Sequence, residues 1–269
     1  EVIGVEIVRR LLRTGTLKNV AGTLIVVPIV NTFGFLNHSR YLPDRRDLNR
    51  CFPGSPHGSL GSRLAHIFMT EIVERCSLGI DLHSAAIHRT NLPQVRVSGN
   101  NPETLRLARV FGAPVILTSA LRDGSLRLEA KRRGVNILLY EAGEGMRFDE
   151  MSVRAGLAGI LRVLKDVGLL PKAGIAAPKA QPLVCSDSHW VRAPAGGLLR
   201  MFKAEGDVIA IDDLVAAISD PFGGGEVEVR TPYGGIIVGR AVMPIVHEGD
   251  ALLHVAAVKS AGQAEAALG

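Results

Sequence analysis

The pattern of apolar residues changes near residue 171, and this change favours a chain built from two different parts. Before it, runs typical of helices alternate with runs typical of strands, as in 61–76 and 78–82. After it, short alternating runs separated by Gly, Pro and Asp extend from Leu183 to Val258. The first pattern predicts an α/β domain with a mixed sheet flanked by helices, and the second predicts an all-β module.

The predicted elements of the first part leave one long loop between them. Helices are predicted over 1–13, 61–76, 102–111, 125–133 and 149–168. Strands are predicted over Gly22–Val30, Leu78–Leu82, 93–98, 114–118 and Val135–Tyr140. Residues 31–60, rich in Asn, Pro, Gly, Arg and His, form the loop. Loops of this length in a compact domain are usually functional.

These patterns also set the predicted boundaries. Residues 1–170 form the α/β domain, 171–182 (PKAGIAAPKAQP) a linker, 183–259 a β-sandwich domain and 260–269 a tail. Hydrophobic residues make up 47% of the chain and charged residues 21%, so a full core can be buried.

Charge and cysteine usage exclude several classes of protein. The net charge of +5 suits a small anionic substrate, but no Lys/Arg run with interleaved aromatics points to nucleic acid. Cys51, Cys76 and Cys185 are far apart and form no CxxC motif, which predicts a reducing cytoplasm rather than a disulfide framework. No apolar run reaches ~18 residues, so no membrane span is expected.

The long loop carries the densest polar cluster, the sequence DLNR at 47–50, with Arg40 upstream. An Arg fork binds a carboxylate through two parallel hydrogen bonds, and Asn adds a neutral donor and acceptor. Asp47 could orient one of the arginines. By composition alone, a solvated turn and an anion-binding loop are about equally consistent with this cluster.

Two further polar groups follow strand-like runs, where α/β sheets usually bind ligands. His83 comes after the run at 78–82, with Asp81 able to orient its imidazole if the imidazole binds a metal. Glu141 follows the run at 135–140 and is a candidate general base. Each residue also has a simpler interpretation: His83 as a structural histidine and Glu141 as a surface carboxylate.

Taken together, DLNRCFPG at 47–54, DLHS at 81–84 and YEAGEG at 140–145 resemble the succinylglutamate desuccinylase/aspartoacylase family of zinc carboxypeptidase-like hydrolases. The three motifs occur in the family's order, and the resemblance covers about residues 1–170. Their joint occurrence is more specific than any one of them. The resemblance implies a zinc-carboxypeptidase-like α/β fold.

The family also shows an H-G-x-E element that opens a helix and supplies two zinc ligands. This chain begins with EVIGVEIVRRLL, which is similar to the family sequence from that Glu onward. The resemblance therefore maps one ligand onto Glu1, and the ligand His, with the first strand, is expected upstream of a truncated N-terminus. His38 and His57 lie in the loop without matching spacing.

The resemblance implies one Zn²⁺ per chain, bound by the upstream His, Glu1 and His83, with Asp47 and Asp81 as orienting partners. Catalytic zinc takes three protein ligands and keeps one position for water. Glu141 would be the general base, and Arg40 would stabilise the oxyanion. Asn49 and Arg50 would bind a substrate carboxylate. The expected activity is hydrolysis of the amide bond of an N-acyl amino acid, or of a related small amide that carries a carboxylate, in amino-acid metabolism, by a small homo-oligomer.

Two alternatives remain at this point, a zinc carboxypeptidase acting on short peptides and a metal-free remnant that serves as a binding module. His88, Arg89 and Asn91 either line the pocket or belong to an ordinary loop, and Arg122 has no assigned role. The C-terminal pattern resembles a lipoyl/biotinyl-type β-sandwich. It offers no convincing acceptor Lys, since Lys203 has the setting of a surface residue, so a role beside the active site or in assembly is expected.

Overall fold

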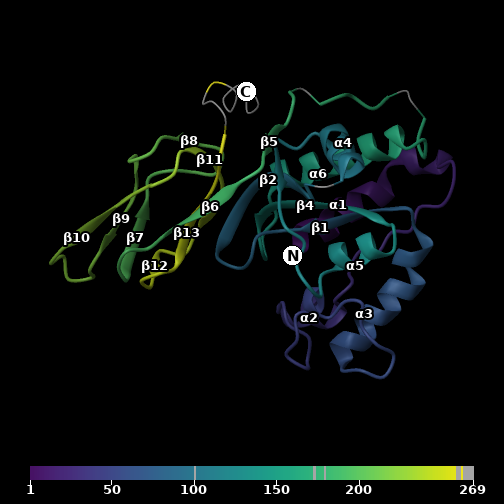
Figure 1. Cartoon of the computed structure of the whole chain (residues 1–269), viewed down its shortest axis with the longest axis horizontal. Helices are drawn as coiled ribbons and strands as arrows, with labels where there is room; N and C mark the ends of the chain where they lie inside the picture. The colour runs from purple at the N-terminus through teal and green to yellow at the C-terminus, as the bar shows by residue number, and fades with distance from the viewer. Residues whose placement is uncertain (100, 172–173, 179, 259–261, 263–269) are drawn as a thin grey trace.

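The computed structural model describes residues 1–99, 101–171, 174–178, 180–258 and 262. The chain consists of a helical α/β part and a β-rich part that extends to one side of it (Figure 1). The predicted tail, 260–269, lies outside the described residues apart from Gly262. The predicted linker, 171–182, is described only in part.

The helical elements all precede the β-rich part. They are α1 (Val2–Arg13), η1 (Gly15–Asn19), α2 (Thr32–Asn37), η2 (Leu48–Arg50), α3 (Leu60–Glu71), η3 (Val73–Arg75), α4 (Pro102–Phe111), α5 (Leu126–Arg132) and α6 (Glu150–Asp166). Side chains that accept backbone N–H groups begin several of them, as Asp149 does for α6. Among the described helices, none is long and apolar enough to cross a bilayer.

Among the described residues, nine strands form one mixed sheet and four form a second sheet. The strands are β1 (Leu78–His83), β2 (Arg89–Val97), β3 (Val115–Thr118), β4 (Asn136–Glu144), β5 (Leu183–Cys185), β6 (Ser188–Arg192), β7 (Gly197–Met201), β8 (Val208–Ile209), β9 (Leu214–Ser219), β10 (Glu226–Arg230), β11 (Gly235–Ala241), β12 (Ile245–Val246) and β13 (Ala251–Ala256). The mixed sheet flanked by helices is as predicted.

Strand β2 joins the two parts of the molecule. One edge pairs antiparallel with β4. The other edge is shared, because residues 89–91 pair with β11 whereas residues 94–97 pair with β3. The large sheet therefore runs in the order β1-β4-β2-β11-β13-β6 and continues from the helical part into the β-rich part.

Buried apolar clusters hold these layers together. On one face of the large sheet, α1, α4 and α6 pack around residues such as Ile7, Phe111 and Tyr140. On the other face, residues of α3 and α5 gather with Leu48 and Phe52 of the long loop. The β-rich part has its own apolar core between the two sheets. The scarcity of aromatics is met by aliphatic packing, as the composition requires.

The strand predicted at Gly22–Val30 is wrong. Residues 22–30 form no strand and pair with none of the described strands. Leu24 instead packs beside the cluster of α1, α4 and α6, and Val30 beside the cluster of α3 and α5. An apolar run indicates that side chains are buried, but a strand also needs a partner ladder to satisfy its backbone groups.

Candidate metal and catalytic site

The parallel pair β1 and β4 places His83 directly beside Glu141. Residues in register on neighbouring strands point to the same face of a sheet, and residues two apart share that face. His83, Asp81 and Glu141 therefore share one face with Ile137, which packs against the α3–α5 cluster. Strand β4 runs through Glu144, so Glu141 lies inside a strand and not after one as predicted.

Helix α1 brings Glu1 to the same place. Its apolar stripe, which includes Ile3 and Ile7, is fully buried, and Glu1 stands at its N-cap position. Gly4 allows the close approach of α1 to β1, because a Cβ at Gly4 would lie 3.1 Å from Cβ of Leu82. Leu82 immediately precedes His83, so this close approach brings the start of α1 near His83.

His83 lies between two carboxylates. Its Nδ1 is 3.3 Å from a carboxylate oxygen of Glu1, and its Nε2 is 2.9 Å from Oδ2 of Asp81. Burial alone would lower the pKa of His83, but the charges of Asp81 and Glu1 and the hydrogen bonds to both raise it well above 6.5. Burial likewise opposes ionisation of Glu1, but the charge and hydrogen bond of His83 hold its pKa below 4.5.

These three side chains fit part of a zinc site. Nδ1 of His83 and the Glu1 carboxylate face each other, and both are ordinary zinc ligands. Asp81 holds the other ring nitrogen, as carboxylates commonly do for a ligating histidine. Among the described residues, no group of three His, Cys, Asp or Glu side chains converges as a complete ligand set.

Arg40 and Asp47 of the long loop stand at the edge of this group. Nη2 of Arg40 is 2.9 Å from Oδ2 of Asp47, and Nη1 of Arg40 is 3.8 Å from Oε1 of Glu1. Asp47 also accepts the backbone N–H of Asn49, which fixes the turn. The structure thus brings Arg40 beside Glu1 and pairs its guanidinium with Asp47, and the roles of Arg40 and Asp47 in the site stay predictions.

Asn49 and Arg50 differ in how they are held. The side-chain oxygen of Asn49 accepts the backbone N–H of Leu126, which docks the loop on the start of α5. Arg50 is exposed, and its guanidinium donates to the backbone oxygen of Asn49. No described residue accepts from the amide nitrogen of Asn49. The structure leaves their substrate-binding roles as predictions.

Both carboxylate oxygens of Glu141 are engaged from strand β2. The amide nitrogen of Asn91 donates to Oε1 across 2.9 Å, and Nε of Arg96 lies 2.7 Å from Oε2. The contact with Arg96 is an ion pair without the geometry of a directed hydrogen bond. Asn91, read from the sequence as lining the pocket or lying in a plain loop, belongs to β2 and is buried.

Sequence reasoning missed two arginines near these acids. Arg96 was not singled out because no motif marks it, and one charged residue on a half-buried strand is easily taken for a surface residue. Arg127 projects from α5. Burial and the charge of Arg96 lower its pKa, whereas Asp81 and Glu141 act in the opposite direction. Its Nη2 donates to Ser119, and its buried Nη1 meets no acceptor among the described residues.

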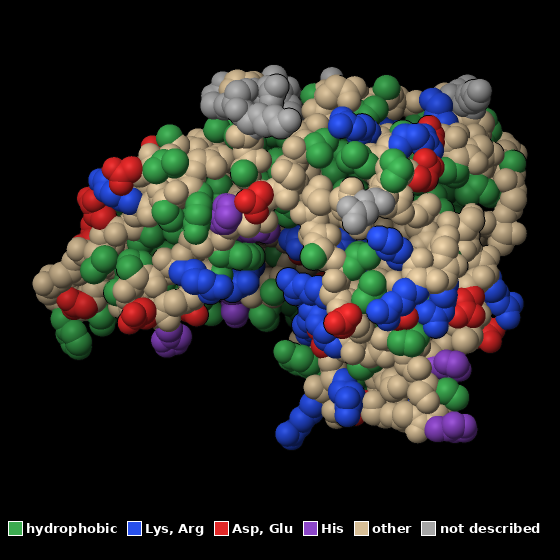
Figure 2. Space-filling view, in the orientation of Figure 1, with side chains coloured by type: hydrophobic (Ala, Val, Ile, Leu, Met, Phe, Trp, Pro, Cys, Tyr) green, Lys and Arg blue, Asp and Glu red, His purple; other side chains and the backbone are tan. Residues whose placement is uncertain are grey.

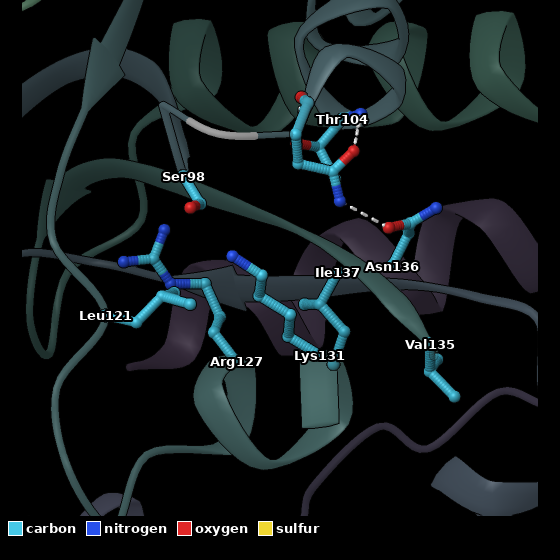
Figure 3. A pocket seen from close by; sticks show the side chains of 9 residues that line it. Ser98, Thr104, Leu121, Arg127, Lys131, Val135, Asn136 and Ile137 are labelled. Atoms are coloured by element: carbon cyan, nitrogen blue, oxygen red, sulfur yellow. Dashed lines mark hydrogen bonds between the residues drawn. The ribbon is translucent and has the colours of Figure 1, made fainter. Parts of the chain in front are cut away.

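A small pocket adjoins Arg127 on α5. Figure 3 shows Arg127 and Lys131 projecting from α5 toward Ser98. The opposite wall includes Asn101, whose amide nitrogen donates to Oδ1 of Asn136 across 2.7 Å. The pocket thus carries two cationic side chains, Arg127 and Lys131, among polar and apolar neighbours. It lies toward the start of β4, whereas Glu141 lies five residues further along the same strand.

Comparison with known proteins matches this arrangement to one family. A model of the succinylglutamate desuccinylase/aspartoacylase catalytic domain matches residues 1–167. A curated relative, the N-alpha-acetyl-L-2,4-diaminobutyric acid deacetylase of Halomonas elongata, is 26% identical over 96% of this chain and 79% of its own.

Solved structures extend the likeness to the β-rich part. A succinylglutamate desuccinylase/aspartoacylase from Rhodobacter sphaeroides is 27% identical, with a TM-score of 0.85 over 96% of this chain and 82% of its own. The product-bound ectoine utilization protein EutE (DoeB) from Ruegeria pomeroyi is 25% identical, with a TM-score of 0.85 over 95% of this chain and 81% of its own. Coverage of nearly the whole chain means that both parts are shared.

Proposed function

The chain belongs to the succinylglutamate desuccinylase/aspartoacylase family, and on this premise we propose that it is a zinc-dependent hydrolase of N-acyl amino acids. The family cleaves the amide bond between an acyl group and an amino acid. The observation that carries the proposal is the convergence of Glu1 and His83, with Asp81 on the second ring nitrogen of His83.

Glu1 and His83 would hold the metal in this proposal, and Asp81 would keep the His83 ring oriented. Zinc, when bound, supplies Lewis acidity toward a carbonyl oxygen and lowers the pKa of water toward ~7. The remaining tasks belong to side chains of this chain. They are to bind the substrate, to take and return a proton, and to stabilise the charge that develops on oxygen.

Glu141 is the proposed general base. It shares a sheet face with His83 and stands in register with it, so its carboxylate borders the space in front of Glu1 and His83. The contacts from Asn91 and Arg96 fix its orientation. It would take a proton from the attacking water and deliver it to the leaving amine.

Arg40 is the proposed oxyanion partner. Its guanidinium stands beside Glu1 and is held by Asp47, so its donors are positioned before substrate arrives. Preorganised donors of this kind stabilise charge that appears only in the transition state. Asn49 and Arg50, in the turn that follows, are proposed to bind a carboxylate of the substrate.

The substrate proposed is small and carries a carboxylate. Lys and Arg side chains gather beside the hollow between the helical part and the β-rich part in Figure 2. This distribution suits an anionic ligand. The name of the Halomonas elongata relative, a deacetylase of an N-acetylated amino acid, supports the same class of substrate.

The β-rich part is proposed to be a lipoyl/biotinyl-like sandwich at residues 183–259 that borders the active site. In support, β11 of that part pairs with residues 89–91 of β2, and the amide nitrogen of Asn91 donates to Glu141. A cytoplasmic location is proposed because Cys51, Cys76 and Cys185 are all free thiols.

Elemental analysis of the full-length gene product, combined with a substrate panel, tests the proposal. We expect about one zinc per chain, and hydrolysis of N-acetyl or N-succinyl amino acids that is lost with a chelator and restored by zinc. Absence of zinc under zinc-replete conditions, together with no hydrolysis across the panel, would refute it. Release of C-terminal residues from short peptides, with no deacylation, would instead identify a carboxypeptidase.

A further inference from the structure

We propose that Asn91 is a positioning residue for Glu141 and that strand β11 of the β-rich part holds Asn91 in its working orientation through Gly239. The inference rests on the proposed function, in which Glu141 is the general base. It gives the β-rich part a defined effect on the reaction, transmitted through one side chain.

Asn91 has the geometry for this role. It is buried, with 7% of its surface exposed, and its amide nitrogen donates to Oε1 of Glu141 across 2.9 Å. Arg96 approaches the other oxygen, so β2 holds the carboxylate from two sides. A base must keep its oxygen aimed at the water it deprotonates, and a misplacement of ~1 Å can cost a hundredfold in rate.

Gly239 limits where the Asn91 side chain can lie. The two residues are register partners across the antiparallel pair β2 and β11. A Cβ at Gly239 would lie 2.4 Å from Oδ1 of Asn91 and 3.3 Å from the backbone oxygen of Thr90. The first distance is too short for any side chain, so an Ala at this position would push the Asn91 amide away from Glu141.

The backbone of Gly239 does not itself require glycine, since it is absent from the described residues with positive φ. Its value lies in the space it leaves for Asn91. A second contact links β2 and β11. The amide nitrogen of the fully buried Gln94 donates to the backbone oxygen of Val238 across 3.0 Å. Strand β11 thus braces β2 on both sides of the bulge that separates Asn91 from Gln94.

A double-mutant cycle in the full-length enzyme tests the inference. Gly239→Ala and Asn91→Ala are each expected to lower kcat by ~10-fold to ~100-fold, with KM changed by less than about threefold. In the double variant, Gly239→Ala should add no further loss, because the atom it strikes is gone. Gly225→Ala serves as the matched control, since a Cβ there meets nothing within 4 Å.

Asn91→Asp adds a readout that a purely structural role would not change. It keeps the shape of the side chain but places a second carboxylate beside Glu141. Two adjacent carboxylates resist joint ionisation, so the acidic limb of the kcat/KM profile should move to higher pH. This variant also keeps the inference testable if Gly239→Ala fails to fold, which circular dichroism would reveal.

The inference is overturned if Gly239→Ala or Asn91→Asp hydrolyses substrate at the wild-type rate with an unchanged pH profile. It is also overturned if the losses of the two alanine variants multiply in the double variant, which would indicate independent structural damage. A wild-type enzyme inactive on the whole N-acyl panel would reject the proposed function itself. That result differs from an active wild type with unaffected variants.

Discussion

Oδ2 of Asp81 lies 2.9 Å from Nε2 of His83, two residues further along the same face of β1. The contact leaves Nδ1 of His83 directed at Glu1. Within the proposed site, Asp81 therefore determines which ring nitrogen is available to the metal and how the ring is turned.

Replacing Asp81 by Asn tests this dependence. Asp81→Asn removes the charged partner of the imidazole and is expected to weaken zinc binding by ~10-fold to ~100-fold. Competition against a chelator of known affinity measures the change. Asp166→Asn, which affects only a surface ion pair with Arg106, should leave zinc affinity as it was. Equal zinc affinity in the two variants would show that Asp81 does not support zinc binding.

Glu141→Gln separates metal binding from proton transfer. The amide keeps the shape of the side chain but cannot act as a base, so kcat should fall by at least ~100-fold while zinc content stays at the wild-type level. Glu144→Gln is the matched control on the same strand, where the carboxylate pairs with Arg147. A Glu141→Gln enzyme with near-normal turnover would exclude this residue as the base.

Arg40→Ala removes the proposed oxyanion donor. We expect kcat to fall by ~100-fold or more, because the lost interaction forms only as charge develops on the carbonyl oxygen. Arg46→Ala, which removes an exposed partner of Asp44 in the same loop, should retain activity. Steady-state measurement of kcat and KM for Arg40→Ala and the wild type tests this role. A rise in KM with unchanged kcat would show that Arg40 binds the substrate in its ground state instead.

We expect the buried His254 to make the stability of the folded protein depend on pH. Burial, with the charges of Arg96, Arg89 and His189, lowers its pKa from 6.5 to about 4. The unfolded chain therefore binds the proton more tightly, so stability is full above pH 6.5 and is lost as pH falls toward 4. The lost stability amounts to about 3 kcal/mol at pH 4.

Urea unfolding between pH 4 and pH 8 measures this effect. The wild type should show a steeper loss of stability below pH 6.5 than His254→Gln, which cannot titrate. All other titratable groups are the same in the two proteins. The difference between their curves of unfolding free energy against pH therefore reports on His254 alone. Parallel curves would show that His254 keeps an ordinary pKa in the folded protein.

Much of the helical part could be predicted because its signals are local. The helices at 102–111 and 125–133 carry caps and apolar faces of ordinary kind, and α4 and α5 lie where predicted. DLHS marked His83 because a polar pair ends an apolar run. The strand at Gly22–Val30 was wrong because pairing depends on which other strand is adjacent, and a single segment does not encode that.

The site was predictable as a set of residue types but not as a set of contacts. The resemblance named Glu1, His83 and Glu141. The fold places a carboxylate oxygen of Glu1 3.3 Å from Nδ1 of His83 and sets Glu141 in register with His83. The contacts that Asn91 and Arg96 make with Glu141 were not predicted, because they depend on the register between β2 and β4, with its bulge between Asn91 and Gln94. Register is a tertiary property, fixed by packing on both sides of the strand.

The shared edge of β2 also restricts how this chain can be shortened. A protein cut at 171–182 would lose β11 from the edge at Arg89–Asn91 and β5 from the edge at Val115–Leu117. Unpaired backbone groups along such edges are templates for pairing with other chains. Removing the β-rich part would therefore leave an aggregation-prone remnant with an exposed sheet edge beside the proposed base, and not a smaller hydrolase.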